Sequence, residues 1–92
     1  MNTKHKQLLI ANLLIWIVSC LLYCYAYQQD KNAFAYHISG ESFEIYDIPY
    51  FTTITHVTVG FGDVVPRTKL AKIASCIQSV LVFIVNAYLA VL

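Results

Sequence analysis

The sequence predicts an all-α membrane protein with two transmembrane helices and a short re-entrant helix between them. Residues 8–27 and residues 73–92 are two runs of twenty residues without a charged side chain. Each run is about 30 Å long as a helix, which matches the hydrocarbon core of a bilayer. Hydrophobic side chains make up 59% of the 92 residues, against three glycines and two prolines. This composition is unsuited to a soluble domain of such a size.

The first span is expected over residues 8–27, after a short N-terminus of residues 1–7. Lys4 and Lys6 before an apolar run are also compatible with a signal peptide. However, no cleavage site of small residues follows, and Tyr23, Tyr25 and Tyr27 at the end of the run are typical of an interfacial aromatic belt. We therefore interpret the run as a membrane span. Within it, Asn12 and Trp16 lie one turn apart and are expected to pack against a neighbouring helix.

Residues 28–46 are polar and weakly periodic, so they are expected to form a short ordered loop, or turret, outside the bilayer. A short helix is predicted over residues 47–57, with Asp47 as its cap and Pro49 in its first turn. About ten residues cannot cross a bilayer. A half-buried helix followed by irregular backbone is tolerated where it lines a water-filled pore, so residues 47–57 are predicted to be a re-entrant pore helix.

Residues 58–63 read Thr-Val-Gly-Phe-Gly-Asp and have the properties of an ion filter. A dehydrated cation needs a ring of oxygen ligands, and successive backbone carbonyls supply one if all of them face the same axis. Glycine adopts positive φ without strain, so the alternation of glycine with larger residues permits that geometry. One chain supplies a quarter of such a ring, which implies four copies. The predicted K⁺ ligands are Thr58, Val59, Gly60 and Phe61, with Gly62 completing the filter and Asp63 at the outer mouth.

Residues 68–92 are predicted to form the inner helix, in which Ser75, Gln78, Ser79 and Asn86 share one face. Polar side chains inside a membrane face either protein or water. One interpretation is that Ser75, Ser79 and Asn86 line a cavity below the filter, with Phe83 as a gate near the inner mouth. The other is helix packing through small and polar residues, and the sequence leaves both open.

The segment from Thr55 to Asp63, followed by Pro66-Arg67-Thr68 and an apolar helix, resembles the potassium-channel pore signature. In particular it is similar to the miniature potassium channels encoded by algal viruses (the Kcv type). The resemblance covers residues 1–92 as a single pore domain. It implies a potassium-selective homotetramer embedded in lipid, located in a host cell membrane or the internal membrane of the virion, with both termini cytosolic.

This sequence departs from the wider potassium-channel pattern behind the filter. Ile54 and Phe51 occupy places where many channels carry a bracing carboxylate or tryptophan, and from its spacing Tyr50 is a candidate donor to Asp63. No glycine follows Gly62 in the inner helix, which argues against a bending hinge there. The positive-inside rule alone would place the basic residues between the spans inside, but a filter near the outer face requires the opposite orientation.

No enzyme, cofactor or nucleic-acid partner is predicted. His56 has no second ligand or base at matching spacing and is expected to pack behind the filter, and Cys20, Cys24 and Cys76 are interpreted as buried small hydrophobes. Two rival functions remain: a subunit that suppresses a host channel, and a weakly selective viroporin. Neither needs both filter glycines, so the intact motif favours a conducting channel.

Overall fold

The computed structural model of the chain describes residues 3–36, 41–57 and 62–91. Three α-helices dominate, with one 3₁₀ turn and one pair of short strands between them. In chain order the elements are α1 (Thr3–Gln29), β1 (Phe34–Tyr36), η1 (Ile45–Asp47), α2 (Ile48–His56), β2 (Val64–Pro66) and α3 (Lys69–Val91).

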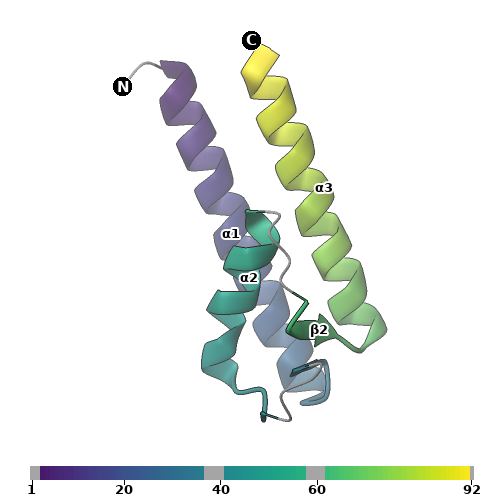
Figure 1. Ribbon diagram of the computed structural model, residues 1–92. Helices are drawn as coiled ribbons and strands as arrows, with labels where there is room; N and C mark the ends of the chain where they lie inside the picture. Colours follow the sequence, from purple (N-terminus) through teal and green to yellow (C-terminus); the bar gives the residue numbers. More distant parts are fainter. Residues whose placement is uncertain (1–2, 37–40, 58–61, 92) are drawn as a thin grey trace.

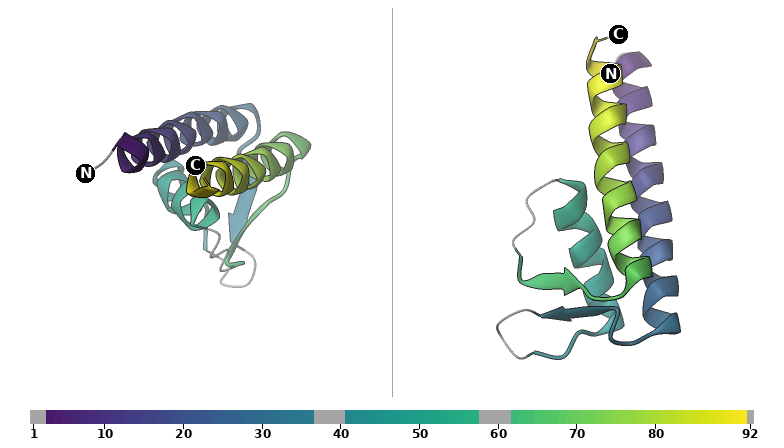
Figure 2. Two further views of the ribbon diagram at one scale, coloured as in Figure 1. Left: turned by 90° about the horizontal axis from the view of Figure 1, so that it is seen from above. Right: turned by 90° about the vertical axis from the view of Figure 1, so that its right-hand side faces the viewer.

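The two long helices α1 and α3 run antiparallel and side by side, so that α1 begins and α3 ends at the same end of the molecule (Figures 1 and 2). The short helix α2 packs against both and ends about halfway along them (Figure 1). The longest dimension is 44 Å, close to the thickness of a bilayer with its headgroups. Among the described residues, α1 and α3 are the helices long and apolar enough to cross a membrane. The predicted all-α membrane fold is confirmed.

The outer helix is longer than expected from its apolar run. It begins at Thr3 rather than at residue 8 and continues to Gln29. Lysine and glutamine are good helix formers, so the backbone hydrogen bonds continue past the point where the hydrophobic side chains end. Helix α3 begins at Lys69, and the hydroxyl of Thr68 accepts a hydrogen bond from the amide of Ala71 at 3.2 Å, as an N-cap residue does.

Asp47 directly precedes α2, as expected, but the side-chain cap predicted for it is wrong. Asp47 has helical backbone angles at the end of η1, and its carboxylate makes no hydrogen bond to the first turn of α2. Instead, its Oδ2 atom accepts a hydrogen bond from the amide of Glu44 at 2.9 Å. The 3₁₀ turn that leads into α2 points this side chain backwards, and Pro49 in the first turn of α2 lowers the need for a cap because it has no N–H.

The sequence analysis missed a two-stranded antiparallel sheet. Strands β1 and β2 pair with Phe34 opposite Pro66, Ala35 opposite Val65 and Tyr36 opposite Val64. The amide of Arg67 extends the pairing with a bond of 2.6 Å to the carbonyl of Ala33. The sheet ties the segment after α1 to the segment that leads into α3.

An aromatic core lies where α1, α2 and β1 meet. Phe34 is 2% exposed, and the centroid of its ring lies 5.6 Å from that of Tyr23, 5.1 Å from that of Phe51 and 5.1 Å from that of Phe43. Such pairs stabilise a core beyond their buried area. This core joins the turret to the helices.

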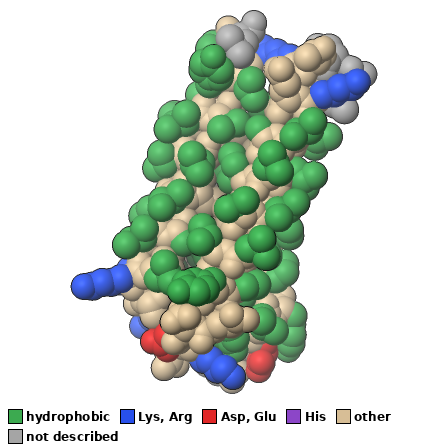
Figure 3. Space-filling view, turned by 180° about the vertical axis from the view of Figure 1, so that it is seen from behind, with side chains coloured by type: hydrophobic (Ala, Val, Ile, Leu, Met, Phe, Trp, Pro, Cys, Tyr) green, Lys and Arg blue, Asp and Glu red, His purple; other side chains and the backbone are tan. Residues whose placement is uncertain are grey.

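The long helices expose apolar side chains along most of their length. Figure 3 shows hydrophobic groups over both helices on one face, with charged groups gathered toward the two ends. The exposed large hydrophobic side chains include Leu13, Leu21, Ile73, Ile84 and Tyr88. Such a surface is suited to lipid or to other copies of the chain.

Replacing Phe34 by alanine should remove three ring contacts and leave a cavity in the aromatic core. Substitutions of this kind cost about 3–5 kcal/mol in the free energy of unfolding. Thermal unfolding of the detergent-solubilised protein measures the change. Phe34→Leu is the matched control and should lose clearly less. Equal midpoints for wild type and Phe34→Ala would contradict a packed core at this position.

Candidate functional site

The predicted filter follows the C-terminal end of α2. The four residues predicted as K⁺ ligands, Thr58, Val59, Gly60 and Phe61, lie outside the described residues and stay predictions. The structure does describe both flanks of the motif: the last turn of α2 on one side, and Gly62 with Asp63 on the other. The contacts of these two flanks therefore define the candidate site.

On the outer flank, Gly62 has a φ of +78°, in the left-handed region. A Cβ atom built there would meet no heavy atom within 4 Å, so glycine is required by the backbone angle and not by lack of space. Beyond it, the Oδ2 atom of Asp63 accepts the Tyr50 hydroxyl at 2.5 Å, and its Oδ1 atom accepts the amide of Val64 at 3.0 Å. The predicted Tyr50–Asp63 bond is confirmed, and it forms within one chain.

The outer face beside Asp63 carries a hollow of about 440 Å³ with an acidic lining. The residues that line it are Tyr36, Glu41, Asp47, Tyr50 and Asp63. Burial raises the pKa of Tyr36 to about 12, together with the neighbouring Asp47 carboxylate, which accepts a hydrogen bond from the Tyr36 hydroxyl. The hydrogen bond to Asp63 raises the pKa of Tyr50. Both tyrosines are therefore donors at neutral pH, and the carboxylates create a potential that attracts cations.

On the inner flank, an open cavity of about 570 Å³ lies against the end of α2. It is lined by Asn12, His56, Val57, Val82, Phe83, Asn86 and Ala87. Phe83 is 73% exposed there. The cavity thus adjoins Val57, the residue directly before the filter motif.

Amide side chains from the two spans meet beside this cavity. The Nδ2 atom of Asn12 donates to Oδ1 of Asn86 at 3.1 Å, and Nδ2 of Asn86 donates to Oδ1 of Asn12 at 3.0 Å. Near them, Nε2 of His56 lies 3.0 Å from Oδ1 of Asn12. The packing contact expected for Asn12 is therefore a hydrogen-bonded one, and it involves both neighbouring helices.

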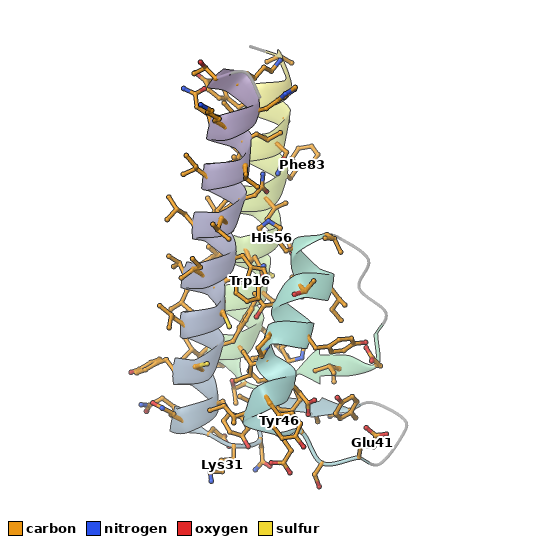
Figure 4. The ribbon with its side chains drawn as sticks, turned by 90° about the vertical axis from the view of Figure 1, so that its left-hand side faces the viewer. Trp16, Lys31, Glu41, Tyr46, His56 and Phe83 are labelled. Carbon is orange, nitrogen blue, oxygen red and sulfur yellow. The ribbon has the colours of Figure 1, made fainter. Side chains whose placement is uncertain are left out.

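Trp16 also contacts α2, through a bond of 3.1 Å from its Nε1 atom to the hydroxyl of Thr53. Figure 4 shows Trp16 and His56 in the region where α1 and α2 meet. Helix α2 is therefore tied to the outer helix by two separate hydrogen bonds.

The polar side chains predicted to share one face of α3 lie in different environments. Gln78 is 1% exposed and faces protein, with its Nε2 atom 3.1 Å from the carbonyl of Thr52. Ser75 and Ser79 are partly buried, and their hydroxyls donate to backbone carbonyls of their own helix at 3.0 and 2.9 Å. Asn86 both pairs with Asn12 and lines the inner cavity. The sequence signal that could have separated the amides from the serines is their size and polarity. An amide inside an apolar span is costly unless it has a specific hydrogen-bond partner.

The three cysteines are free thiols. Cys20 and Cys24 are partly buried on α1, and Cys76 is exposed on α3. Over the described parts of the chain, no group of three histidine, cysteine or carboxylate side chains is placed to hold a metal ion.

Two helices long and apolar enough to cross a membrane, a short helix packed against both and a hollow with an acidic lining are typical of a pore-forming membrane protein. A family profile described as an ion channel matches residues 12–92, and the chain belongs to this ion channel family. It is similar to the potassium channel protein kcv of Paramecium bursaria Chlorella virus 1, with 46% identity over 39 residues. That match covers 42% of this chain and 42% of the relative, and no solved structure was found to match. The resemblance to viral potassium channels is confirmed.

Alkaline pH should break the outer tyrosine–carboxylate contacts. Because the pKa of Tyr36 in the folded chain, about 12, exceeds its ordinary value of 10.0, its contribution to stability is complete below about pH 10 and is lost as the pH rises toward 12. Thermal unfolding measured across this range should show a fall in midpoint that is smaller in Tyr36→Phe. Asp47→Asn, which keeps an acceptor but removes the charge, should lie between them. An unchanged pH dependence in Tyr36→Phe would exclude this contact as the source.

Proposed function

We propose that the chain assembles as a homotetramer that conducts K⁺ passively and selectively through a filter made of residues 58–62. The observation that carries this proposal is the position of the Thr-Val-Gly-Phe-Gly sequence. It begins two residues after His56, the last residue of α2, and ends at Gly62, which adopts the left-handed backbone that glycine permits without strain. The similarity to a viral protein named as a potassium channel supports the same selectivity.

The tetramer follows from the ring that an ion requires. One chain can offer one set of carbonyl oxygens, and four sets around an axis replace the hydration shell of K⁺. The apolar faces of α1 and α3 would then be divided between lipid and neighbouring subunits. The exposed Ile84 and Leu13 are examples of side chains that need such cover in an aqueous solution but not in a bilayer.

The inner cavity is suited to hold a hydrated cation below the filter. Helix α2 directs its C-terminal carbonyl end toward the middle of the spans (Figure 1), and the negative end of the helix dipole favours a cation there. Val57 and Phe83 line the same hollow. We infer that Ser75, Ser79 and Asn86 border this water-filled region in the tetramer and that Phe83 narrows its inner mouth.

The same arrangement supports one orientation in the membrane. The acidic hollow around Asp63 faces the outside, where it concentrates cations, and the ends of α1 and α3 that carry the termini face the cytosol. The proposed location is a host cell membrane or the internal membrane of the virion.

A planar-bilayer recording of purified protein tests the function directly. With KCl on one side and NaCl on the other, the current should reverse far from zero, with the NaCl side positive, because K⁺ crosses and Na⁺ does not. Current without discrimination would indicate a viroporin, and no current would favour a regulatory subunit. A cross-linking experiment on the same sample should give tetramers.

Replacing Gly62 by alanine should abolish potassium current. The backbone at this position has a φ of +78°, and an L-residue held there costs about 1–2 kcal/mol in each subunit. Because no described residue of the chain, its immediate neighbours aside, lies within 4 Å of the added Cβ, we expect tetramers still to assemble. Bilayer recording and cross-linking measure the two results. Normal selectivity in Gly62→Ala would show that this residue is not part of the filter, and Ser42→Ala in the turret is the control.

Cysteine modification should show which face of α3 meets water. In a background without Cys20, Cys24 and Cys76, a cysteine at position 79 should react with a charged thiol reagent added from the cytosolic side, and the current should fall. Val80 and Tyr88 are 55% and 62% exposed in one chain and lie on other faces of the helix. Cysteines there should stay unreactive if they face lipid, since a thiol in hydrocarbon stays protonated. The opposite pattern would mean that the helix is rotated relative to our proposal.

A further inference from the structure

A connected set of polar side chains crosses the bundle at membrane depth. It runs from Asn86 on α3 to Asn12 on α1, then to His56 on α2, to Gln78 on α3 and to Tyr23 on α1. Tyr23 is fully buried and Gln78 is 1% exposed. Among the described residues, no buried side-chain nitrogen or oxygen lacks a hydrogen-bond partner. The set therefore joins all three helices through hydrogen bonds.

The direction of each bond follows from the donors available. The hydroxyl of Tyr23 donates to Oε1 of Gln78 at 2.6 Å, so the other end of that amide is its NH₂ group. This NH₂ group contacts the carbonyl of Thr52 at 3.1 Å and Nδ1 of His56 at 3.3 Å. An amide NH₂ group has two hydrogens to donate and cannot accept one, so Nδ1 of His56 must accept a hydrogen bond from it.

The tautomer of His56 is thereby determined. With Nδ1 as the acceptor, the ring proton is on Nε2 and is donated to Oδ1 of Asn12 at 3.0 Å. The same oxygen accepts from Nδ2 of Asn86, and the second hydrogen of each asparagine is donated to a backbone carbonyl, Leu8 for Asn12 and Val82 for Asn86. Every amide hydrogen in the set has an acceptor, so the pattern is consistent throughout.

We propose that His56 is a positioning residue for the filter. It belongs to the last turn of α2 and precedes Thr58, the first filter residue, by two positions. Its ring is held on one side by the outer helix, through Asn12, and on the other by the inner helix, through Gln78. Figure 4 shows the ring at the end of α2, directed toward the two spans. The last turn of α2, which leads into the filter motif, is therefore held by both spans.

The inference rests on the proposed function, because positioning is read out through ion selectivity. A buried donor or acceptor that loses its partner keeps the full cost of its desolvation. In this set, removal of the His56 ring leaves one hydrogen of the Gln78 amide without its acceptor and takes one of two donors from Oδ1 of Asn12, which keeps the bond from Asn86. Displacement of the last turn of α2 is the expected response, and the potassium-to-sodium permeability ratio should register it.

Three substitutions separate the two bonds of the ring. His56→Phe keeps a ring and removes both bonds. His56→Asn keeps an acceptor near the position of Nδ1, and His56→Gln keeps a donor near the position of Nε2. The matched control is Trp16→Phe, which removes the bond to the Thr53 hydroxyl and so also weakens the contact between α1 and α2.

Two quantities are measured for each variant: the thermal midpoint of the tetramer and the permeability ratio in the bilayer. Both His56→Phe and Trp16→Phe should lower the midpoint. The ratio should fall about fivefold or more in His56→Phe, since about fivefold corresponds to one lost buried bond and this variant loses two, and it should fall less in the asparagine and glutamine variants. In Trp16→Phe it should stay within about twofold of wild type.

An unchanged ratio in a conducting His56→Phe channel, or an equal fall in Trp16→Phe, would overturn the positioning role. If His56→Phe forms no tetramer, the asparagine and glutamine variants decide: a lowered ratio in either one supports the proposal, and wild-type ratios in both overturn it. Failure of the wild-type channel to discriminate K⁺ from Na⁺ is a different result, because it would overturn the proposed function itself.

Discussion

Hydrocarbon offers no hydrogen-bond partner, and this constraint determines how the three helices associate. A polar group inside the bilayer must find its partner within the protein. Asn12, His56, Gln78 and Asn86 satisfy one another and the backbone around them, and they come from three different helices. Apolar side chains cannot specify a contact in this setting, since lipid solvates them equally well. The polar set therefore gives the bundle its register.

The outer end of the molecule is held by different forces. There, water is present and the hydrophobic effect operates, so burying Phe34 among Tyr23, Phe51 and Phe43 contributes directly to stability. The small sheet adds backbone hydrogen bonds between segments that precede α2 and follow the filter motif. Helix α2 is attached to both regions: to the aromatic core through Phe51 near its beginning, and to the polar set through His56 at its end.

The two flanks of the filter motif are thus supported separately. The outer flank is attached to α2 by the bond from Tyr50 to Asp63, and from there it continues into β2. The inner flank is attached to both spans by way of His56. Gly62 adopts its left-handed backbone without strain, so the surroundings hold the segments on either side of the motif instead. Here tyrosine and histidine make these contacts, where many channels use tryptophan and a carboxylate.

The sequence alone determined the fold class, the two long apolar helices, a short helix between them and the ion channel family, because apolar runs and a glycine-containing signature are local patterns. It also allowed the Tyr50–Asp63 bond to be predicted, since Tyr50 lies near the start of the short helix and Asp63 directly follows the motif after it. The sheet, the role of Asp47 and the different environments of the polar side chains of α3 were decided by tertiary structure. Tyr36 pairs with Val64, and Asn12 with Asn86, across separations that no periodicity encodes. An amide inside a span indicates that a hydrogen-bond partner is needed, but the packing of the helices determines which residue that partner is.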